Sequence, residues 1–175
     1  MGKTGIIRPD LHFLLRHPAH FIALGFGSGL PPKAPGTFGT LAALPLYALM
    51  LALGCCTSVI VGICVITFLV GWWAAHVTGK NLGVHDHGAI VVDEIVAMWL
   101  VLLFVPGGIS YSEMALWWAV AFGLFRLFDI WKPWPIRVLD AKVPGGFGVM
   151  LDDLLAAVYA IVVMVVLEAL VGFWL

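Results

Sequence analysis

Apolar residues form long segments along this chain, and most polar residues fall in the connections between them. Five segments approach the roughly 20 residues that a membrane-spanning helix needs. They run from about Thr40 to Leu53, Ser58 to Ala75, Ile90 to Val105, Met114 to Phe128 and Leu154 to Leu175. The pattern predicts an all-α, polytopic helical membrane protein with about five transmembrane or membrane-embedded helices, some of them short or tilted.

The N-terminal part follows a different pattern. Residues 21–30 are apolar but are interrupted by Gly25, Gly27 and Gly29. This stretch is too short to span a bilayer, so we expect an interfacial or re-entrant segment. Residues 1–37 would then form a cytoplasmic or interfacial N-terminal segment of a single membrane domain covering residues 1–175, since the length suggests one domain.

Composition strengthens the membrane prediction. The chain is 62% hydrophobic and 11% charged, whereas soluble domains carry about 25% charged residues. A soluble domain of this size could not bury so much apolar surface. The net charge of −1 and the absence of a basic, aromatic-interleaved patch argue against a nucleic-acid partner. Membrane lipid is the expected partner, and no protein partner can be inferred.

Charge alternates between successive connections. The connections at residues 54–57 and 106–113 have no Lys or Arg, so all nine basic residues collect on one side. By the positive-inside rule this side is the cytoplasm, with the N-terminus inside and the C-terminus outside. The connections and adjoining helix ends on this side hold the carboxylates Asp86, Asp93, Glu94, Asp129, Asp140, Asp152 and Asp153. This segregation predicts a polar site at the cytoplasmic face.

Asp93 and Glu94 lie together in the first turn of the third predicted helix. The helix dipole favours negative charge there by less than about 1 kcal/mol. Two carboxylates so close to hydrocarbon need a stronger partner, so we expect a bound cation. The preceding triplet His85-Asp86-His87 could ligate a transition metal, but a solvated loop is favoured because a third ligand is missing.

Two further segments bring carboxylates to helix ends. Arg126, Asp129 and Lys132 are spaced three residues apart and would share a helix face if the helix persists to Lys132. Residues 144–148 are rich in glycine, which would allow close backbone approach to a ligand. Asp152 and Asp153 would then open the last helix.

A glycine-rich stretch at residues 25–40 leads into the first long helix. Its spacing is not that of a dinucleotide-binding loop and no strand precedes it. Ser28, Lys33 and Thr37 could nevertheless help a helix N-terminus to bind a phosphate. Several carboxylates without a Cys/His ligand set favour a hard cation, Mg²⁺ or Mn²⁺. Together these features suggest phosphoryl chemistry on a lipid headgroup, with hydrolysis and transfer both open.

Four stretches in order along the chain resemble the phosphatidylglycerophosphatase A family: residues 25–45 (GFGSGLPPKAPGTFGTLAALP), 83–99 (GVHDHGAIVVDEIVAMW), 125–140 (FRLFDIWKPWPIRVLD) and 143–153 (VPGGFGVMLDD). The resemblance implies a Mg²⁺-dependent, all-helical lipid phosphatase of the bacterial inner membrane. Such an enzyme would hydrolyse phosphatidylglycerophosphate to phosphatidylglycerol and phosphate at the cytoplasmic face.

On this hypothesis the site residues take three roles. The metal ligands would be Asp93, Glu94, Asp129, Asp152 and Asp153. The catalytic residues would be Asp86, Asp93, Glu94 and Asp129, with Asp86 as a proton-transfer group. The phosphate would be bound by Ser28, Lys33, Thr37, Arg126, Lys132 and Arg137. Attack by water and attack by an aspartate both remain open.

A small ion- or proton-coupled membrane transporter that uses the acidic cluster is the alternative from another class. Intramembrane carboxylates also serve as relays. A relay should cross the membrane midplane, whereas these carboxylates collect on one side. The sequence therefore favours the phosphatase.

Overall fold

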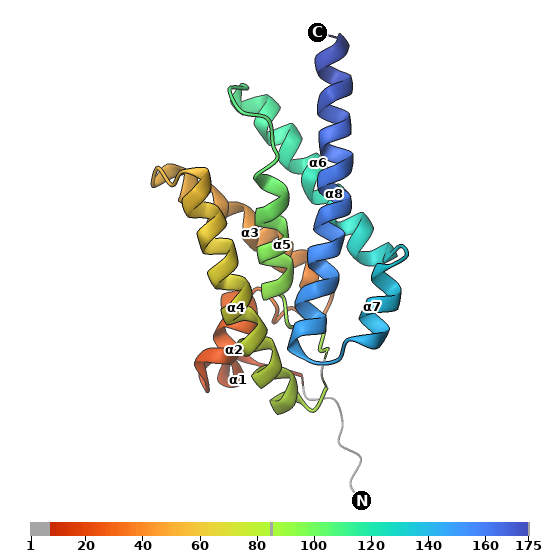
Figure 1. Cartoon of the computed structure of the whole chain (residues 1–175). Coiled ribbons are helices and arrows are strands. Elements are labelled where there is room, and N and C mark those ends of the chain that lie inside the picture. The colour runs from red at the N-terminus through yellow and green to blue at the C-terminus, as the bar shows by residue number, and fades with distance from the viewer. Residues whose placement is uncertain (1–7, 85, 175) are drawn as a thin grey trace, which may run out of the picture.

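The structure, a computed structural model, describes residues 8–84 and 86–174. These residues form helices and connections and contain no strand (Figure 1). The helices are α1 (Leu11–Leu15), α2 (Pro18–Ala23), the 3₁₀ helix η1 (Gly25–Gly27), α3 (Pro35–Ala52), α4 (Thr57–Leu82), α5 (Val92–Leu102), α6 (Tyr111–Trp131), α7 (Ile136–Lys142) and α8 (Gly146–Trp174). The predicted all-α class is confirmed.

Among the described helices, α3, α4, α6 and α8 are long and apolar enough to cross a membrane. The third predicted segment, residues 90–105, is different because its helix α5 has only 11 residues. Its end tightens into short-range hydrogen bonds, from Phe104 N–H to the Val101 carbonyl and from Val105 N–H to the Leu102 carbonyl. Pro106 follows and cannot continue a helix. The third segment is therefore a short embedded helix.

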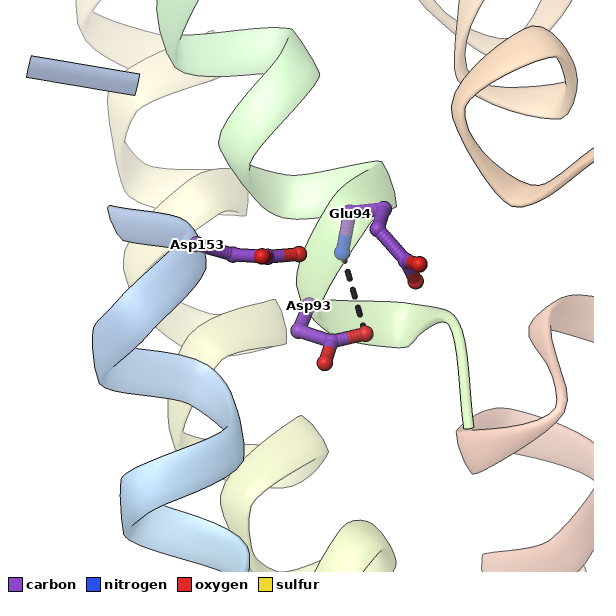
Figure 2. Close-up of side chains that lie close together, drawn as sticks. All are labelled: Asp93, Glu94 and Asp153. Carbon is purple, nitrogen blue, oxygen red and sulfur yellow. Dashed lines mark hydrogen bonds between the residues drawn. The ribbon is translucent and has the colours of Figure 1, made fainter. Parts of the chain in front are cut away.

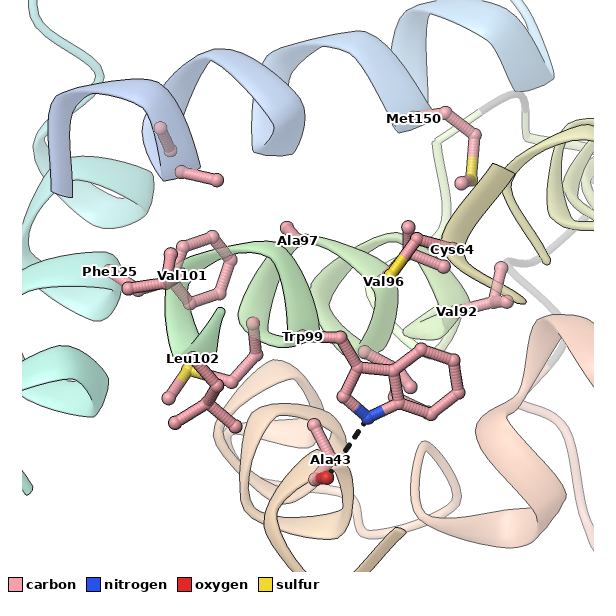
Figure 3. Close-up of a cluster of buried hydrophobic side chains, with 14 of the residues drawn as sticks. Ala43, Cys64, Val92, Val96, Ala97, Trp99, Val101, Leu102, Phe125 and Met150 are labelled. Atoms are coloured by element: carbon pink, nitrogen blue, oxygen red, sulfur yellow. Dashed lines mark hydrogen bonds between the residues drawn. The ribbon is translucent and has the colours of Figure 1, made fainter. Parts of the chain in front are cut away.

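Helix α5 lies at the centre of the bundle and packs against α3, α4, α6 and α8. All of its residues except Leu100 are buried. The Trp99 indole N–H donates a 3.0 Å hydrogen bond to the Ala43 carbonyl of α3 (Figure 3). Small buried residues of α8, such as Ala156 and Ala160, let neighbouring helices approach closely. The bundle thus encloses the helix that carries the acidic pair.

The two ends of the bundle differ. Helices α1, α2 and α7 gather toward the end where the described chain begins, together with the start of α8 (Figure 1). The C-terminus and the α3–α4 and α5–α6 connections lie at the opposite end. We call the first of these the polar end, because the first turn of α5 and the basic helix α7 belong to it.

Several boundaries differ from those predicted. Helix α3 begins at Pro35, five residues before Thr40, and proline suits the first helical position. Helix α4 continues past Ala75 through a polar stretch to Leu82, where Gly83 ends it with φ of 77°. Helix α7 was not predicted. Residues 21–30 form the end of α2 and η1, in agreement with a segment too short to span.

The last helix begins eight residues earlier than predicted, at Gly146 rather than Leu154. The expectation that Asp152 and Asp153 open this helix is therefore wrong. A side chain at Gly146 would meet the backbone of α4, since its Cβ would lie 2.5 Å from the Trp72 carbonyl oxygen and the His76 nitrogen. Gly146 lets α8 pack closely against α4. This packing offsets the cost of about 1 kcal/mol that a glycine brings to a helix.

Candidate metal centre

A backbone hydrogen bond to α2 holds the first turn of α5 in place. The Val91 N–H donates a 2.9 Å hydrogen bond to the Ala23 carbonyl of α2. Val91 is the N-cap of α5 and has no side-chain capping hydrogen bond. Asp93 takes up part of that role, because its Oδ1 accepts a 3.0 Å hydrogen bond from the Glu94 N–H. The prediction that both carboxylates lie in the first turn of this helix is confirmed.

Asp153 of α8 joins this pair across the helix interface (Figure 2). One carboxylate oxygen from each of Asp93, Glu94 and Asp153 lies within 4.8 Å of the others. We call these three residues the acidic trio. Their exposed fractions are only 7%, 9% and 4%. Two unit charges about 4 Å apart repel by roughly 4 kcal/mol at an effective dielectric constant near 20, so three charged carboxylates here require protons or a cation.

The acidic trio fits a divalent metal ion. Glu94 Oε2 and Asp153 Oδ2 are buried and have no hydrogen-bond partner among the described residues. Buried polar atoms are normally paired, so such atoms call for a ligand or water. Mg²⁺ and Mn²⁺ prefer oxygen donors of this kind. The residues present are therefore chemically suited to the predicted cofactor.

The two other predicted metal ligands have protein cations beside them. Asp129 Oδ2 lies 2.5 Å from Arg126 Nη1, and Asp152 Oδ2 lies 2.5 Å from Lys132 Nζ. Arg126 Nη1 is also 3.8 Å from Glu94 Oε1. The structure thus brings three of the five predicted ligands together and pairs the other two with Arg126 and Lys132, which were predicted to bind phosphate.

Lys132 connects three helices at the polar end. It ends α6 in a left-handed conformation with φ of 45°, so the helix does not persist to Lys132 and the condition for a shared helical face with Arg126 and Asp129 is not met. Its Nζ also donates a 3.0 Å hydrogen bond to Asp140 of α7. Burial would lower the pKa of Lys132, but the hydrogen bonds to Asp152 and Asp140 outweigh it and raise the pKa above its ordinary value. Lys132 therefore stays positively charged.

Asp86 lies in the connection before α5. Asp86 is exposed, but nearby protein removes part of the water around its carboxyl group. This desolvation raises its pKa; Lys132 and His87 oppose the shift, while Asp140 and Asp129 add to it. Asp86 therefore lies close enough to Lys132 for the two charges to interact. His87 Nδ1 accepts a hydrogen bond from Ala89 N–H within the same loop, and His85 lies outside the described residues.

The glycine-rich stretch approaches the acidic trio at one residue. Gly36, in the first turn of α3, leaves no room for a side chain, because a Cβ there would collide with Glu94 Oε1 and lie 3.1 Å from Arg126 Nη1. Thr37 follows it and is half-buried. The N-terminus of α3 therefore faces Glu94.

The other predicted phosphate-binding residues are not drawn into this cluster. The Ser28 hydroxyl donates a 2.8 Å hydrogen bond to the Gly25 carbonyl within its own turn. Lys33 and Arg137 are exposed, and the ion pairs found among the described residues include neither of them. Their role in phosphate binding stays a prediction.

Sequence reasoning overlooked the contributions of Gly36 and Asp140. Pro35 is a recognised signal for a helix start and could have placed Gly36 in the first turn of α3. Its contact with Glu94, however, depends on tertiary packing. Asp140 follows Lys132 by eight residues, and only the short helix α7 brings the two side chains together.

Fold and site together define a helical membrane protein whose central short helix presents buried carboxylates suited to a divalent cation. The family model described as Phosphatidylglycerophosphatase A matches residues 21–168. The chain belongs to the phosphatidylglycerophosphatase A family, which confirms the family and the phosphatase class predicted from sequence.

Two curated relatives carry the same name. The chain is 45% identical to Phosphatidylglycerophosphatase A of Escherichia coli (strain K12) over 147 residues, which cover 82% of this chain and 80% of the relative. It is 44% identical to Phosphatidylglycerophosphatase A of Haemophilus influenzae over 154 residues, covering 88% and 91%. No solved structure matches the chain significantly.

Proposed function

We propose that this protein hydrolyses phosphatidylglycerophosphate to phosphatidylglycerol and phosphate with the help of Mg²⁺. The two relatives named for this activity support the reaction. The observation that carries the metal dependence is the acidic trio, whose buried oxygens Glu94 Oε2 and Asp153 Oδ2 lack protein partners. Family membership and the position of the trio at one end of the bundle both disfavour the transporter.

Three carboxylates would bind the metal, and two basic residues would orient the carboxylates beside it. Asp93, Glu94 and Asp153 would hold the metal. Arg126 and Lys132 would orient Asp129 and Asp152 beside it, because side chains that support ligands set their geometry. When bound, Mg²⁺ supplies the charge that polarises a phosphoryl group and makes a water molecule more acidic.

The reaction requires one bond to form and one to break. A water oxygen attacks phosphorus, the bond to the glycerol oxygen breaks, and the leaving oxygen takes a proton. Asp86, whose pKa is raised, would move protons at the mouth of the site. Thr37 and the N-terminus of α3 would bind the phosphate. Attack by a carboxylate is the competing route, and acid quenching of a single turnover would trap its phosphorylated protein.

The same features support a proposal for the location of the protein. Four described helices are suited to cross a membrane, and the positive-inside rule assigns the basic side to the cytoplasm. We place the protein in the bacterial inner membrane with the polar end in the cytoplasm, forming a single domain over residues 1–175. Cysteine accessibility at Ala141 of α7 in intact cells and in lysates would test this orientation, since Ala141 is exposed.

Phosphate release from phosphatidylglycerophosphate by the purified protein in detergent tests the function. We expect release with Mg²⁺, none with EDTA, and none from Asp93→Asn. The matched control is Glu168→Gln, which removes an exposed carboxylate far along α8 and should leave activity unchanged. No release by the wild-type protein, or equal release by Asp93→Asn and Glu168→Gln, would disprove the proposal.

A further inference from the structure

An apolar groove runs along the bundle between α4, α5 and α8. It has a volume of about 250 Å³ and is lined by five residues of α4, two of α5 and Leu154 of α8. Cys64 and Val96, which lie next to each other at its floor, are buried (Figure 3). Val65 and Leu69 form part of its outer wall and are each 54% exposed. The groove therefore opens to the side of the bundle, along the exposed face of α4.

The groove ends beside the acidic trio, and a crevice too small to hold a water molecule separates them. A smaller crevice shares Phe68, Val96 and Leu154 with it and is also lined by Asp93. Leu154 directly follows Asp153 in α8, and Val96 lies one turn after Asp93 in α5. From Leu69 the groove continues along α4 to Val61, a distance of about 12 Å at a rise of 1.5 Å per residue.

We propose that this groove binds an acyl chain of the lipid substrate while the phosphorylated headgroup lies at the acidic trio. The inference rests on the proposed function and adds the position of the lipid. One molecule with an anionic headgroup and apolar tails matches two neighbouring features of the bundle, a carboxylate centre suited to a metal and an apolar groove beside it. The headgroup and the chain are joined through one glycerol, so binding the chain restricts where the headgroup can lie.

The groove orients the lipid and adds little hydrophobic affinity. An acyl chain leaves one apolar environment, the bilayer or a detergent micelle, for another of similar polarity. Its contribution comes from holding the reacting group in position. Blocking the groove should therefore lower kcat/KM for lipids whose chains reach it and leave short-chain substrates unaffected.

Two adjacent residues of α4 give a matched test. Val65 lines the groove, whereas Ile66 is 64% exposed and does not line it. Val65→Trp and Ile66→Trp would be assayed with dipalmitoyl and dihexanoyl phosphatidylglycerophosphate in the same detergent. We expect Val65→Trp to lower kcat/KM about tenfold for the dipalmitoyl lipid only, and Ile66→Trp to match the wild-type protein with both. Equal behaviour of the two variants with the dipalmitoyl lipid would overturn the proposal.

Two other outcomes would also overturn it. A similar loss with the dihexanoyl lipid would mean that Val65→Trp disturbs the site itself. A change in oligomeric size in detergent, for Val65→Trp alone, would mean that a second copy of the chain occupies the groove.

Cys64 provides a readout that does not depend on turnover. Cys55 and Cys56 are the other free cysteines of the chain, so Cys55→Ser/Cys56→Ser leaves Cys64 alone. With EDTA preventing turnover, the dipalmitoyl lipid should slow the reaction of Cys64 with N-ethylmaleimide at least about threefold, and the dihexanoyl lipid should not. Equal labelling rates would contradict the groove assignment. If the wild-type protein released no phosphate from either lipid, the proposed hydrolysis would fail, and this labelling would decide the groove independently.

Discussion

The carboxylates at the polar end fall into two groups that differ in their partners. Asp129 and Asp152 lie against Arg126 and Lys132. The acidic trio is buried to about the same degree as Asp152, but Asp93 and Asp153 have no ion pair among the described residues. The two groups meet in α8, where Asp152 belongs to the first group and the next residue, Asp153, to the acidic trio.

The difference indicates where an external cation belongs. A buried carboxylate beside a guanidinium or ammonium group is already neutralised. Asp93 and Asp153 have no such group beside them, so they stay charged together with Glu94 only if a further cation joins them. The first group would therefore organise the site, and the trio would bind the metal. Substitutions in the two groups should consequently have different effects.

Asp153→Asn should have the largest effect, because it removes a proposed metal ligand. We expect phosphate release to fall at least about 10³-fold. In EDTA the variant should be more thermally stable than the wild-type protein, since one of three mutually repelling carboxylates is gone. Phosphate assays and thermal unfolding in detergent measure both. A variant that is inactive and also less stable in EDTA would indicate a structural role.

Asp86→Asn tests a carboxylate that lies outside both groups. Loss of a proton-transfer group should lower kcat about 10²- to 10³-fold and remove one ionisation from the pH profile. The raised pKa means that the folded state holds the proton more tightly than the unfolded chain. Asp86 therefore costs stability at neutral pH, and this cost vanishes below its ordinary pKa of 3.8.

The stability expected for Asp86→Asn follows from the direction of this pKa shift. The variant should unfold at a slightly higher temperature than the wild-type protein at pH 7, and the two should converge as the pH falls. An unchanged pH profile with wild-type kcat would remove Asp86 from the mechanism.

Gly36→Ala would move one member of the trio without changing its charge. The added Cβ would collide with Glu94 Oε1, the end of a flexible side chain, so the carboxylate should shift and the helix should persist. We expect a loss of about 10²-fold in kcat, the effect of a misplacement near 1 Å.

The control for Gly36→Ala is Gly62→Ala in α4, where nothing lies within 4 Å of an added Cβ. Gly62→Ala should keep full activity. Equal activity of the two variants would show that Glu94 needs no fixed position.

Lys132→Met tests the group of carboxylates that protein cations neutralise, Asp129 and Asp152. Asp152 would lose its partner and point less reliably toward the trio, so we expect activity to fall about tenfold while Mg²⁺ is still bound. Asp140→Asn removes the more exposed end of the same network and should change activity less than about threefold, as solvent-exposed ion pairs contribute little. Complete loss of metal binding in Lys132→Met would erase the distinction between the groups.

The sequence predicted the helical class, the segregation of the carboxylates and the place of Asp93 and Glu94 in the first turn of α5. These features follow from hydropathy and charge patterns, which are local. The sequence did not reveal that α5 is short and buried except at Leu100, because residues 90–105 are almost uniformly apolar. Nor did hydropathy show that α8 begins at Gly146, because the close packing of Gly146 against the backbone of α4 is a tertiary contact.

The division of the five predicted ligands was also beyond the sequence. Asp152 and Asp153 are adjacent and chemically identical, and only their directions around α8 send one to Lys132 and the other to Glu94. Arg126 and Lys132 suit phosphate and carboxylate equally well by residue type. Whether Arg126 and Lys132 contact a phosphate or a carboxylate depends on where α6 ends and α7 begins.

Binding of Mn²⁺ in place of Mg²⁺, followed by electron paramagnetic resonance in detergent, tests the central claim most directly. The wild-type protein, Lys132→Met and Glu168→Gln should each bind Mn²⁺, whereas Asp153→Asn should bind it at least about 30-fold more weakly. Wild-type Mn²⁺ affinity in Asp153→Asn would contradict the assignment of the acidic trio as the metal centre.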